Sequence, residues 1–227
     1  MDDARHTWLR HIMRVRVTFS KQGWIIYSSH LDLMRAWERA LRRARLPLAY
    51  SGGFNPRPKI QLARALPLGH AGEEEILDVW FETRVPLDDL AERLVPVLPE
   101  GLAVSEVQEV DEKAPAMQTQ VVGTVYRVML EWQGTKEELG SQVRALLAED
   151  ELIHERRGKR YDLRPLIEGL RLVEVDPQTG WATLWMKLSA RPGATGRPEA
   201  VLDVLGTGDA FARYSREGLI LAGEPEA

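Results

Sequence analysis

The chain of 227 residues contains no cysteine. This absence excludes disulfide bonds, thiolate catalysis and any zinc or iron–sulfur site held by cysteine. No apolar run approaches the roughly 20 residues needed to cross a bilayer, and the N-terminus, MDDARHTW, lacks the basic and then apolar layout of a signal peptide. We therefore expect a cytoplasmic protein that does not enter a membrane. Residues 1–12, which precede the first strand-like run, are expected to be disordered or an extension.

Common catalytic and cofactor motifs are also missing. The sequence has no glycine-rich phosphate loop before a helix and no nucleophile elbow. Apart from His30 and Asp32, it has no group of His, Asp and Glu at the spacing of metal ligands. We therefore predict no catalytic residue, no metal and no cofactor, and a non-catalytic role is favoured.

Charge is distributed unevenly along the chain, although the net charge is only −4. Residues 28–64 contain eight Lys or Arg against two acidic residues, whereas residues 65–120 contain thirteen acidic residues against three basic ones. Such separation can steer an anionic partner to one face of a protein. The alternative is solvated charge that segregates without a function.

The hydrophobic pattern of the first half predicts the order β-α-β-β-α-β. Strands are indicated at residues 14–19, 60–63, 75–81 and 102–110 by alternation and β-branched residues. A helix that begins near Leu31 is capped by Ser28 or Ser29, and a second helix begins at Pro86. This order is the split-βαβ, or ferredoxin-like, arrangement.

The second half repeats this order coarsely after a polar, proline-bearing linker at residues 111–121. We predict strands at 122–132, 170–175, 181–188 and 219–221, helices at 136–149 and 198–205, and a charged hairpin at 152–163. The expected fold class is α+β, with two ferredoxin-like halves, antiparallel sheets and helices packed on one face. The expected domains are 13–110 and 122–227.

One predicted helix carries a row of arginines. Arg35, Arg39 and Arg42 are spaced i, i+4 and i+7, and Arg43 flanks them, so their guanidinium groups project from one face, opposite the apolar one. Guanidinium forks match successive phosphates or planar carboxylates. The row therefore predicts a nucleic-acid contact, and an exposed amphipathic face is the equal alternative.

A stiff basic loop follows this helix. Two glycines at 52 and 53 allow close backbone approach, and two prolines at 56 and 58 restrict the chain. The loop would display Asn55, Arg57 and Lys59 in one geometry, and we predict that these residues bind nucleic acid. A purely structural loop remains an alternative.

The hairpin of the second half is the third basic segment. Arg156, Arg157, Lys159 and Arg160 surround its turn at Gly158. A basic two-stranded ribbon can follow a nucleic-acid backbone. Charge that protects a solvated edge hairpin explains it equally well.

Residues 14–110 resemble the radical-SAM-linked family of unknown function, whose members occur alone or at the C-terminal end of radical SAM proteins. The resemblance is carried by the segments HLD (30–32), GFNPRPK (53–59), LPLG (66–69) and EILD (75–78), and more weakly by YDLRPLI (161–167). Arg57 stands where the family usually has histidine. The resemblance implies a radical SAM partner. An iron–sulfur cluster would belong to that partner, because this chain has no cysteine to hold one.

Three functional hypotheses follow. The first is a binding module for RNA, such as tRNA or rRNA, that presents its substrate to a radical SAM enzyme. The second is an RNA-modifying or RNA-processing enzyme that uses His30, Asp32 and Arg57, although His30 and Asp32 are better explained as helix-capping residues. The third is a subunit that docks on a radical SAM enzyme through its acidic residues 73–112. The candidate pocket residues are His30, Asp32, Tyr50, Ser51, Phe54 and Arg164.

Overall fold

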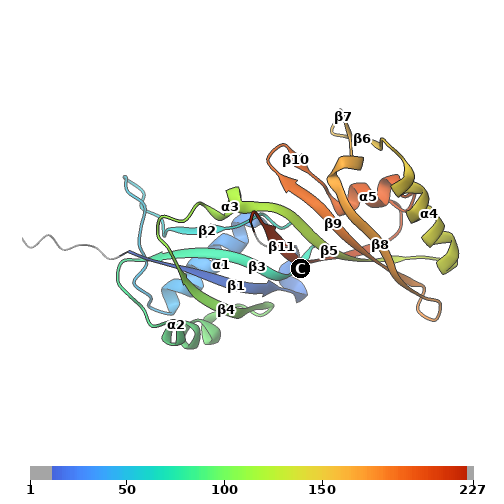
Figure 1. Ribbon diagram of the computed structural model, residues 1–227. Helices are drawn as coiled ribbons and strands as arrows, with labels where there is room; N and C mark the ends of the chain where they lie inside the picture. The colour runs from blue at the N-terminus through green and yellow to red at the C-terminus, as the bar shows by residue number, and fades with distance from the viewer. Residues whose placement is uncertain (1–11, 224–227) are drawn as a thin grey trace, which may run out of the picture.

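The computed structural model of the chain describes residues 12–223 as an α+β fold (Figure 1). The predictions for residues 1–11 and 224–227 lie outside the described residues. No helix within 12–223 has both the length and the apolar character required to span a bilayer.

The first half has the predicted order of strands and helices. Its elements are β1 (Met13–Lys21), η1 (Gly23–Tyr27), α1 (His30–Arg43), β2 (Ile60–Leu62), β3 (Ala71–Phe81), α2 (Leu87–Leu94), η2 (Val95–Val97) and β4 (Leu102–Val110). Ser29 caps α1 by accepting a hydrogen bond from the backbone N–H of Asp32, which satisfies one of the free N–H groups at the start of the helix.

The second half repeats the topology of the first. Its elements are α3 (Met117–Gln120), β5 (Val121–Glu131), α4 (Lys136–Ala148), β6 (Ile153–Arg156), β7 (Lys159–Asp162), η3 (Arg164–Leu166), β8 (Ile167–Asp176), β9 (Trp181–Arg191), β10 (Ala194–Thr195), α5 (Pro198–Val204) and β11 (Ala212–Leu221). The last strand is longer than its apolar residues 219–221 indicated, because its earlier residues carry polar side chains that the alternation rule does not recognise as strand.

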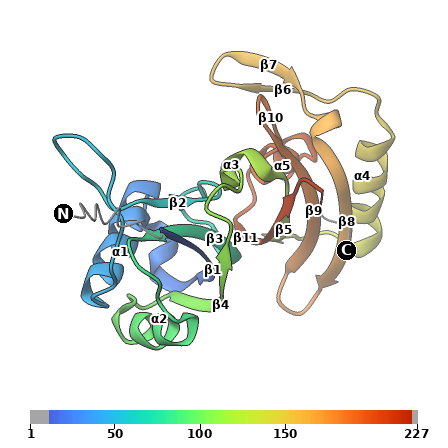
Figure 2. The ribbon, with the colours of Figure 1, turned by 60° about the vertical axis from the view of Figure 1, so that its left-hand side comes forward.

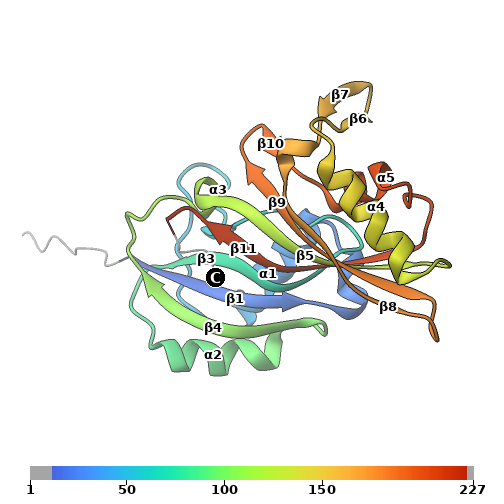
Figure 3. The same cartoon turned by 45° about the vertical axis from the view of Figure 1, so that its right-hand side comes forward.

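One continuous sheet runs through both halves. Its order is β10-β9-β5-β11-β3-β1-β4, with β2 on β3 and β8 on β9. Each half therefore has the ferredoxin-like strand order, β4-β1-β3-β2 and β11-β5-β9-β8. The two orders meet at β11 and β3, which pair in parallel through Ser215–Ala71 and Arg216–Gly72. Figure 3 shows β4, β1, β3, β11 and β5 side by side in this order.

The helices of both halves cover the same face of this sheet. In the first half α1 and α2 pack on the face that carries Val17 and Leu77. In the second half α4 and α5 pack on the face that carries Tyr126. Arg216 lies directly opposite Tyr126 in the β5–β11 pairing and contacts Glu75 on the core face of β3, so the two faces are continuous. The central strands run between the two groups of helices.

Residues 111–121, predicted as a linker, contain the short helix α3, whose Met117 is buried. Gln118 donates its side-chain N–H to the backbone carbonyl of Leu62, so this segment is packed on the first half. Because a single sheet joins both halves, their division into domains at 13–110 and 122–227 stays a prediction.

Candidate functional site

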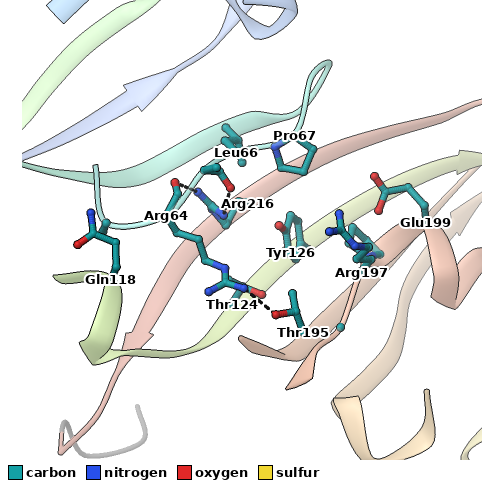
Figure 4. Close-up of a pocket in the computed structure, with 14 residues that line it drawn as sticks. Arg64, Leu66, Pro67, Gln118, Thr124, Tyr126, Thr195, Arg197, Glu199 and Arg216 are labelled. Carbon is teal, nitrogen blue, oxygen red and sulfur yellow. Dashed lines mark hydrogen bonds between the residues drawn. The ribbon is translucent and has the colours of Figure 1, made fainter. Parts of the chain in front are cut away.

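A pocket of about 450 Å³ lies over the central strands where the two halves meet (Figure 4). We call it the central pocket. It is lined by the loop after β2, by β5 and β11, and by the segment that enters α5. The side chains that concern its chemistry are Arg64, Gln118, Tyr126, Thr195, Arg197, Glu199 and Arg216.

Arg216 forms the floor of the central pocket and is 1% exposed. Its Nε and one terminal nitrogen donate to the two carboxylate oxygens of Glu75 at 2.7 and 2.5 Å, and a terminal nitrogen also donates to the Arg64 carbonyl at 3.2 Å. Burial alone would lower the pKa of Arg216, but the Glu75 carboxylate and contact with Tyr126 outweigh it, and the pKa is raised. Arg216 is therefore charged and fixed in place.

Arg64 forms one wall of the central pocket and is half-buried. Its terminal nitrogens donate to the Ala190 carbonyl at 2.8 Å and to the Thr195 hydroxyl at 2.9 Å. The pKa of Arg64 is lowered first by burial and then by the charge of Arg216, with a smaller contribution from Arg197. The neighbouring positive charges thus disfavour the charge on Arg64, and an anion in the pocket would relieve this repulsion.

Arg197 stands opposite, at the residue that precedes α5. Its side chain makes no hydrogen bond to another residue within 12–223, and its charge acts on Glu199 and on Arg64. A guanidinium group carries five N–H donors in a fixed fork. Arg197 therefore offers free donors to a ligand in the central pocket.

Tyr126 supplies the neutral polar group of the central pocket. It is 4% exposed, and burial is the main reason that its pKa is raised. The hydroxyl therefore stays protonated at neutral pH and can donate to an anion or accept from a base or sugar hydroxyl.

Glu199 lines the other side of the pocket and is paired with His70, which lies behind it. His70 Nε2 lies 3.0 Å from Glu199 Oε1, and the imidazole stacks on the ring of Tyr214 at 4.5 Å. Burial would raise the pKa of Glu199, but the hydrogen bond with His70 and the charge of Arg197 help to hold it below its usual value. His70 Nδ1 and Glu199 Oε2 are buried and have no hydrogen-bond partner among the described residues.

The central pocket continues into a second hollow of about 540 Å³ beneath the hairpin of β6 and β7. We call it the hairpin groove. It shares Thr195 and Arg197 with the central pocket and adds the exposed cations Arg156, Arg157 and Lys159. Together these two hollows form a cleft in which cations outnumber carboxylates.

The predicted nucleic-acid residues thus fall into two separate groups. Three of the four hairpin cations border the cleft, and Arg160 is exposed on the same hairpin. The row on α1 is exposed to solvent, with Arg35 paired to Asp32 at 3.4 Å, and neither it nor Asn55, Arg57 or Lys59 lines the cleft. Figures 1 and 2 place the light-blue loop after α1 and the β6–β7 hairpin at opposite ends of the molecule. Of the three basic segments, only the hairpin therefore borders the cleft.

The predicted pocket of His30, Asp32, Tyr50, Ser51, Phe54 and Arg164 does not form one cavity. His30 begins α1 next to η1, near the end of β3 that carries Gly72. Tyr50 to Phe54 belong to the loop anchored near Phe81, at the other end of β3. The nine residue steps between Gly72 and Phe81 span about 30 Å. The shared pocket of His30, Asp32 and Arg57 required by the enzymatic hypothesis is therefore not supported.

Arg164 has a structural role instead. Its side chain donates to the backbone carbonyls of Leu147, Glu149 and Ile167, and so satisfies carbonyls at the end of α4. Ser51 also acts locally, because its hydroxyl accepts from the backbone N–H of Arg57 across the loop. Phe54 is fully exposed at the tip.

The sequence analysis missed Arg64, Arg197, Arg216 and Tyr126, because they are far apart along the chain. One signal was available. Glu75 shares the alternating pattern of Leu77, Val79 and Phe81, so a carboxylate stood on an apolar strand face, where a buried charge needs a partner. Within residues 12–223, no group of three or more His, Asp and Glu has the arrangement of a metal site.

The chain belongs to the family described as "Uncharacterized protein conserved in bacteria (DUF2344)", which matches residues 14–198. No curated protein matches it. Its fold is similar to a chain in the crystal structure of a Cbf5–Nop10–Gar1 complex, with a TM-score of 0.51 and 9% identity over 90% of this chain and 48% of that one.

Two related structures align more weakly. The first is an H/ACA RNP bound to a substrate RNA containing 2′-deoxyuridine, with a TM-score of 0.48 and 9% identity over 90% of this chain and 47% of that one. The second is the archaeal box H/ACA sRNP Nop10–Cbf5 complex, with a TM-score of 0.47 and 11% identity over 91% of this chain and 48% of that one. This chain spans about half the length of those chains, and at such identities the similarity concerns the fold alone. The association with a radical SAM enzyme stays a prediction.

Proposed function

We propose that this protein is a non-catalytic RNA-binding module whose cleft holds the phosphates of an RNA strand. The observation that carries the proposal is the meeting of Arg64, Arg197 and Arg216 around the central pocket. Their charges disfavour one another, and Arg197 has unused donors. A phosphate would accept from the free guanidinium and reduce the repulsion.

A polymer suits the cleft better than a small anion. The hairpin groove places three more cations next to Arg197 in an adjoining hollow, so a ligand with several successive anionic groups is stabilised at each of them. Phosphate contacts of this kind supply most of the sequence-independent affinity for nucleic acids. The exposed row on α1 would contact a separate part of a larger structured RNA, such as tRNA or rRNA.

A radical SAM enzyme is the partner that we propose for this module. The proposal rests on the sequence resemblance of residues 14–110 and 161–167. In this arrangement the module presents RNA, and the partner holds the iron–sulfur cluster, because this chain has no cysteine. The acidic residues 73–112, in which Glu73 and Glu74 are exposed, would provide the contact. Co-purification of the partner that survives high salt would support a direct complex, and its complete absence would refute this part of the proposal.

Replacement of Arg197 by Gln tests the RNA proposal most directly, because this side chain has no hydrogen bond within 12–223 to lose. Loss of one charge-assisted hydrogen bond to phosphate costs roughly 1.5 to 3 kcal/mol, so we expect RNA affinity, measured by fluorescence anisotropy at low salt, to fall about 10- to 150-fold. Arg171→Gln is the matched control, since Arg171 is exposed and stacks on Trp185 on the other face of the sheet. Equal affinity of the Arg197 variant and the parent would refute the proposal.

A further inference from the structure

A third hollow, of about 690 Å³, borders the central pocket on the side opposite the hairpin groove. We call it the aromatic groove. It is lined by η1, by the loop before β3 and by the start of β11, and it shares Glu199 with the central pocket. Its large apolar side chains are Trp24, Tyr27, Leu68, Phe211 and Tyr214.

Four of these side chains are unusually exposed. Trp24 is 61%, Tyr27 71%, Leu68 66% and Phe211 57% accessible. Among residues 12–223, nine large apolar side chains are exposed, and four of the nine surround this one hollow. Single exposed apolar residues are ordinary, but a cluster around a concave surface marks an interaction site.

The aromatic groove is held rigidly. The buried ammonium group of Lys21 donates to the carbonyls of Ile26 at 3.1 Å and Ser28 at 3.3 Å. The backbone N–H of Gly69 also donates to the Ile26 carbonyl, at 2.9 Å. The backbone that carries Trp24 and Tyr27 is therefore held by three hydrogen bonds to two carbonyls. Rigid aromatic surfaces bind flat ligands at a low cost in conformational entropy.

The surroundings of the groove favour a ligand that has flat rings and negative charge. Arg213 lines the groove and stacks over the rings of Trp181 and Phe211, at 5.0 and 5.9 Å. Arg127 also lines the groove, but its charge is paired with Glu217. On the other side of Glu199 the cleft carries its excess of cations. Aromatic rings beside a positively charged track are the arrangement by which proteins bind unpaired nucleotides.

We propose that the aromatic groove stacks unpaired bases of the RNA whose phosphates occupy the central pocket and hairpin groove. This inference rests on the proposed function and specifies its substrate class as single-stranded RNA. The strand runs from the hairpin groove, over Arg197 and Arg64, to the rings of Trp24 and Tyr27. A base-paired duplex cannot use the groove, because its bases are already stacked.

The test compares Trp24→Ala and Tyr27→Ala with the parent for a single-stranded RNA oligonucleotide and for a duplex, by fluorescence anisotropy. Stacking of one base contributes about 1 to 3 kcal/mol, so each variant should bind the single strand roughly 5- to 150-fold more weakly. The dependence of affinity on salt should stay that of the parent, because no charge is lost. Trp24→Phe should recover most of the affinity.

Leu31→Ala is the matched control, because Leu31 is 64% exposed but does not line the groove. If Arg197→Gln weakens binding while Trp24→Ala and Tyr27→Ala do not, the stacking inference is wrong and the phosphate proposal stands. If neither the arginine nor the aromatic variants differ from the parent, both are wrong. Equal affinity of the parent for duplex and single strand, with no loss in the aromatic variants, also overturns the inference.

Discussion

Arg216 on β11 and Glu75 on β3 form a two-point ion pair across the junction of the two halves. Both carboxylate oxygens of Glu75 are engaged, at 2.7 and 2.5 Å, and both residues are almost fully buried. Because β11 and β3 pair through only two residues of each strand, this ion pair is a principal side-chain link between the halves. It also holds a charged group at the floor of the central pocket.

Removing one partner of this pair should destabilise the protein strongly. Arg216→Met leaves the Glu75 carboxylate buried without its guanidinium partner, and such losses cost about 3 to 5 kcal/mol. The double variant Arg216→Met and Glu75→Leu should recover only part of this loss, because the buried Lys21 ammonium also loses the favourable charge of Glu75. Urea unfolding measures the free energy of unfolding of the single and the double variant. As a comparison, Arg84→Gln removes an exposed pair with Glu109, and should cost less than about 1 kcal/mol. Equal stability of the Arg216 and Arg84 variants would contradict this account.

Gly72 leaves space for the Glu75 carboxylate, and alanine there should displace it. Phe19 pairs with Glu75 whereas Lys21 pairs with Gly72, so β3 has one extra residue between these pairs, and the bulge brings Gly72 and Glu75 to the same face. A Cβ on Gly72 would lie 2.6 to 2.9 Å from the Glu75 side chain.

We expect Gly72→Ala to lower the free energy of unfolding by roughly 1 to 3 kcal/mol, through overpacking, and to weaken RNA binding. Gly52→Ala is the control, since a Cβ there meets no atom within 4 Å. If Gly72→Ala is as stable as the parent, the bulge does not serve to position Glu75.

The contribution of Glu199 to stability should depend on pH. Its pKa in the folded protein lies below its ordinary value of 4.5, because interactions that include the hydrogen bond with His70 outweigh the effect of burial. A carboxyl group with a lowered pKa stabilises the fold above its ordinary pKa, and this contribution is lost as the pH falls through the folded pKa.

Glu199→Gln should therefore cost roughly 1 kcal/mol at pH 7, the usual net value of one hydrogen bond, and progressively less below about pH 4.5. Chemical denaturation at several pH values measures the difference from the parent. A difference that grows towards acid pH would contradict the assigned direction.

The turn of the β6–β7 hairpin allows charge to be removed without strain. Arg157 and Gly158 both have positive φ, at 51° and 75°, as in a two-residue hairpin turn that favours Asn followed by Gly. Arg157→Asn should keep or slightly raise the stability of the protein while it lowers RNA affinity. The slope of log affinity against log salt concentration, called the salt slope, should become shallower by about 0.7 for a single strand. An unchanged salt slope with an intact hairpin would show that Arg157 does not contact phosphate.

The row on α1 should contribute separately from the cleft. Replacing Arg35, Arg39 and Arg42 by Gln leaves the buried face of the helix intact, so thermal stability should change little. Binding of a structured RNA should weaken steeply with the loss of three charges, whereas binding of a short single strand should not. If both ligands bind the triple variant as they bind the parent, the row is a solvated face.

The fold could be predicted well from the sequence, because local patterns determine it. The alternation of Val15, Val17 and Phe19, the cap at Ser29 and the apolar row of Leu139, Val143 and Leu146 each identified an element that the structure contains. Two successive β-α-β-β-α-β orders then indicated the ferredoxin-like halves.

The site could be predicted only in part. The hairpin cations were recognised because they are nearly consecutive. Arg64, in contrast, bonds to Thr195, which lies 131 residues later in the chain and next to the segment that carries Arg197. The pairing of β11 with β3 helps to bring such segments together, and no local periodicity encodes that pairing. For the same reason the sequence could not show that the hairpin borders the cleft whereas the row on α1 does not.

The position of β11 has a consequence for biosynthesis. Residues 12–211 emerge from the ribosome before this strand does. The first four strands can pair during that time, because they are consecutive in the chain. Arg216 arrives later, and until then Glu75 has no guanidinium partner. The nascent protein therefore completes the floor of its central pocket late in translation, and premature termination ahead of Ala212 should leave a chain that cannot complete its junction.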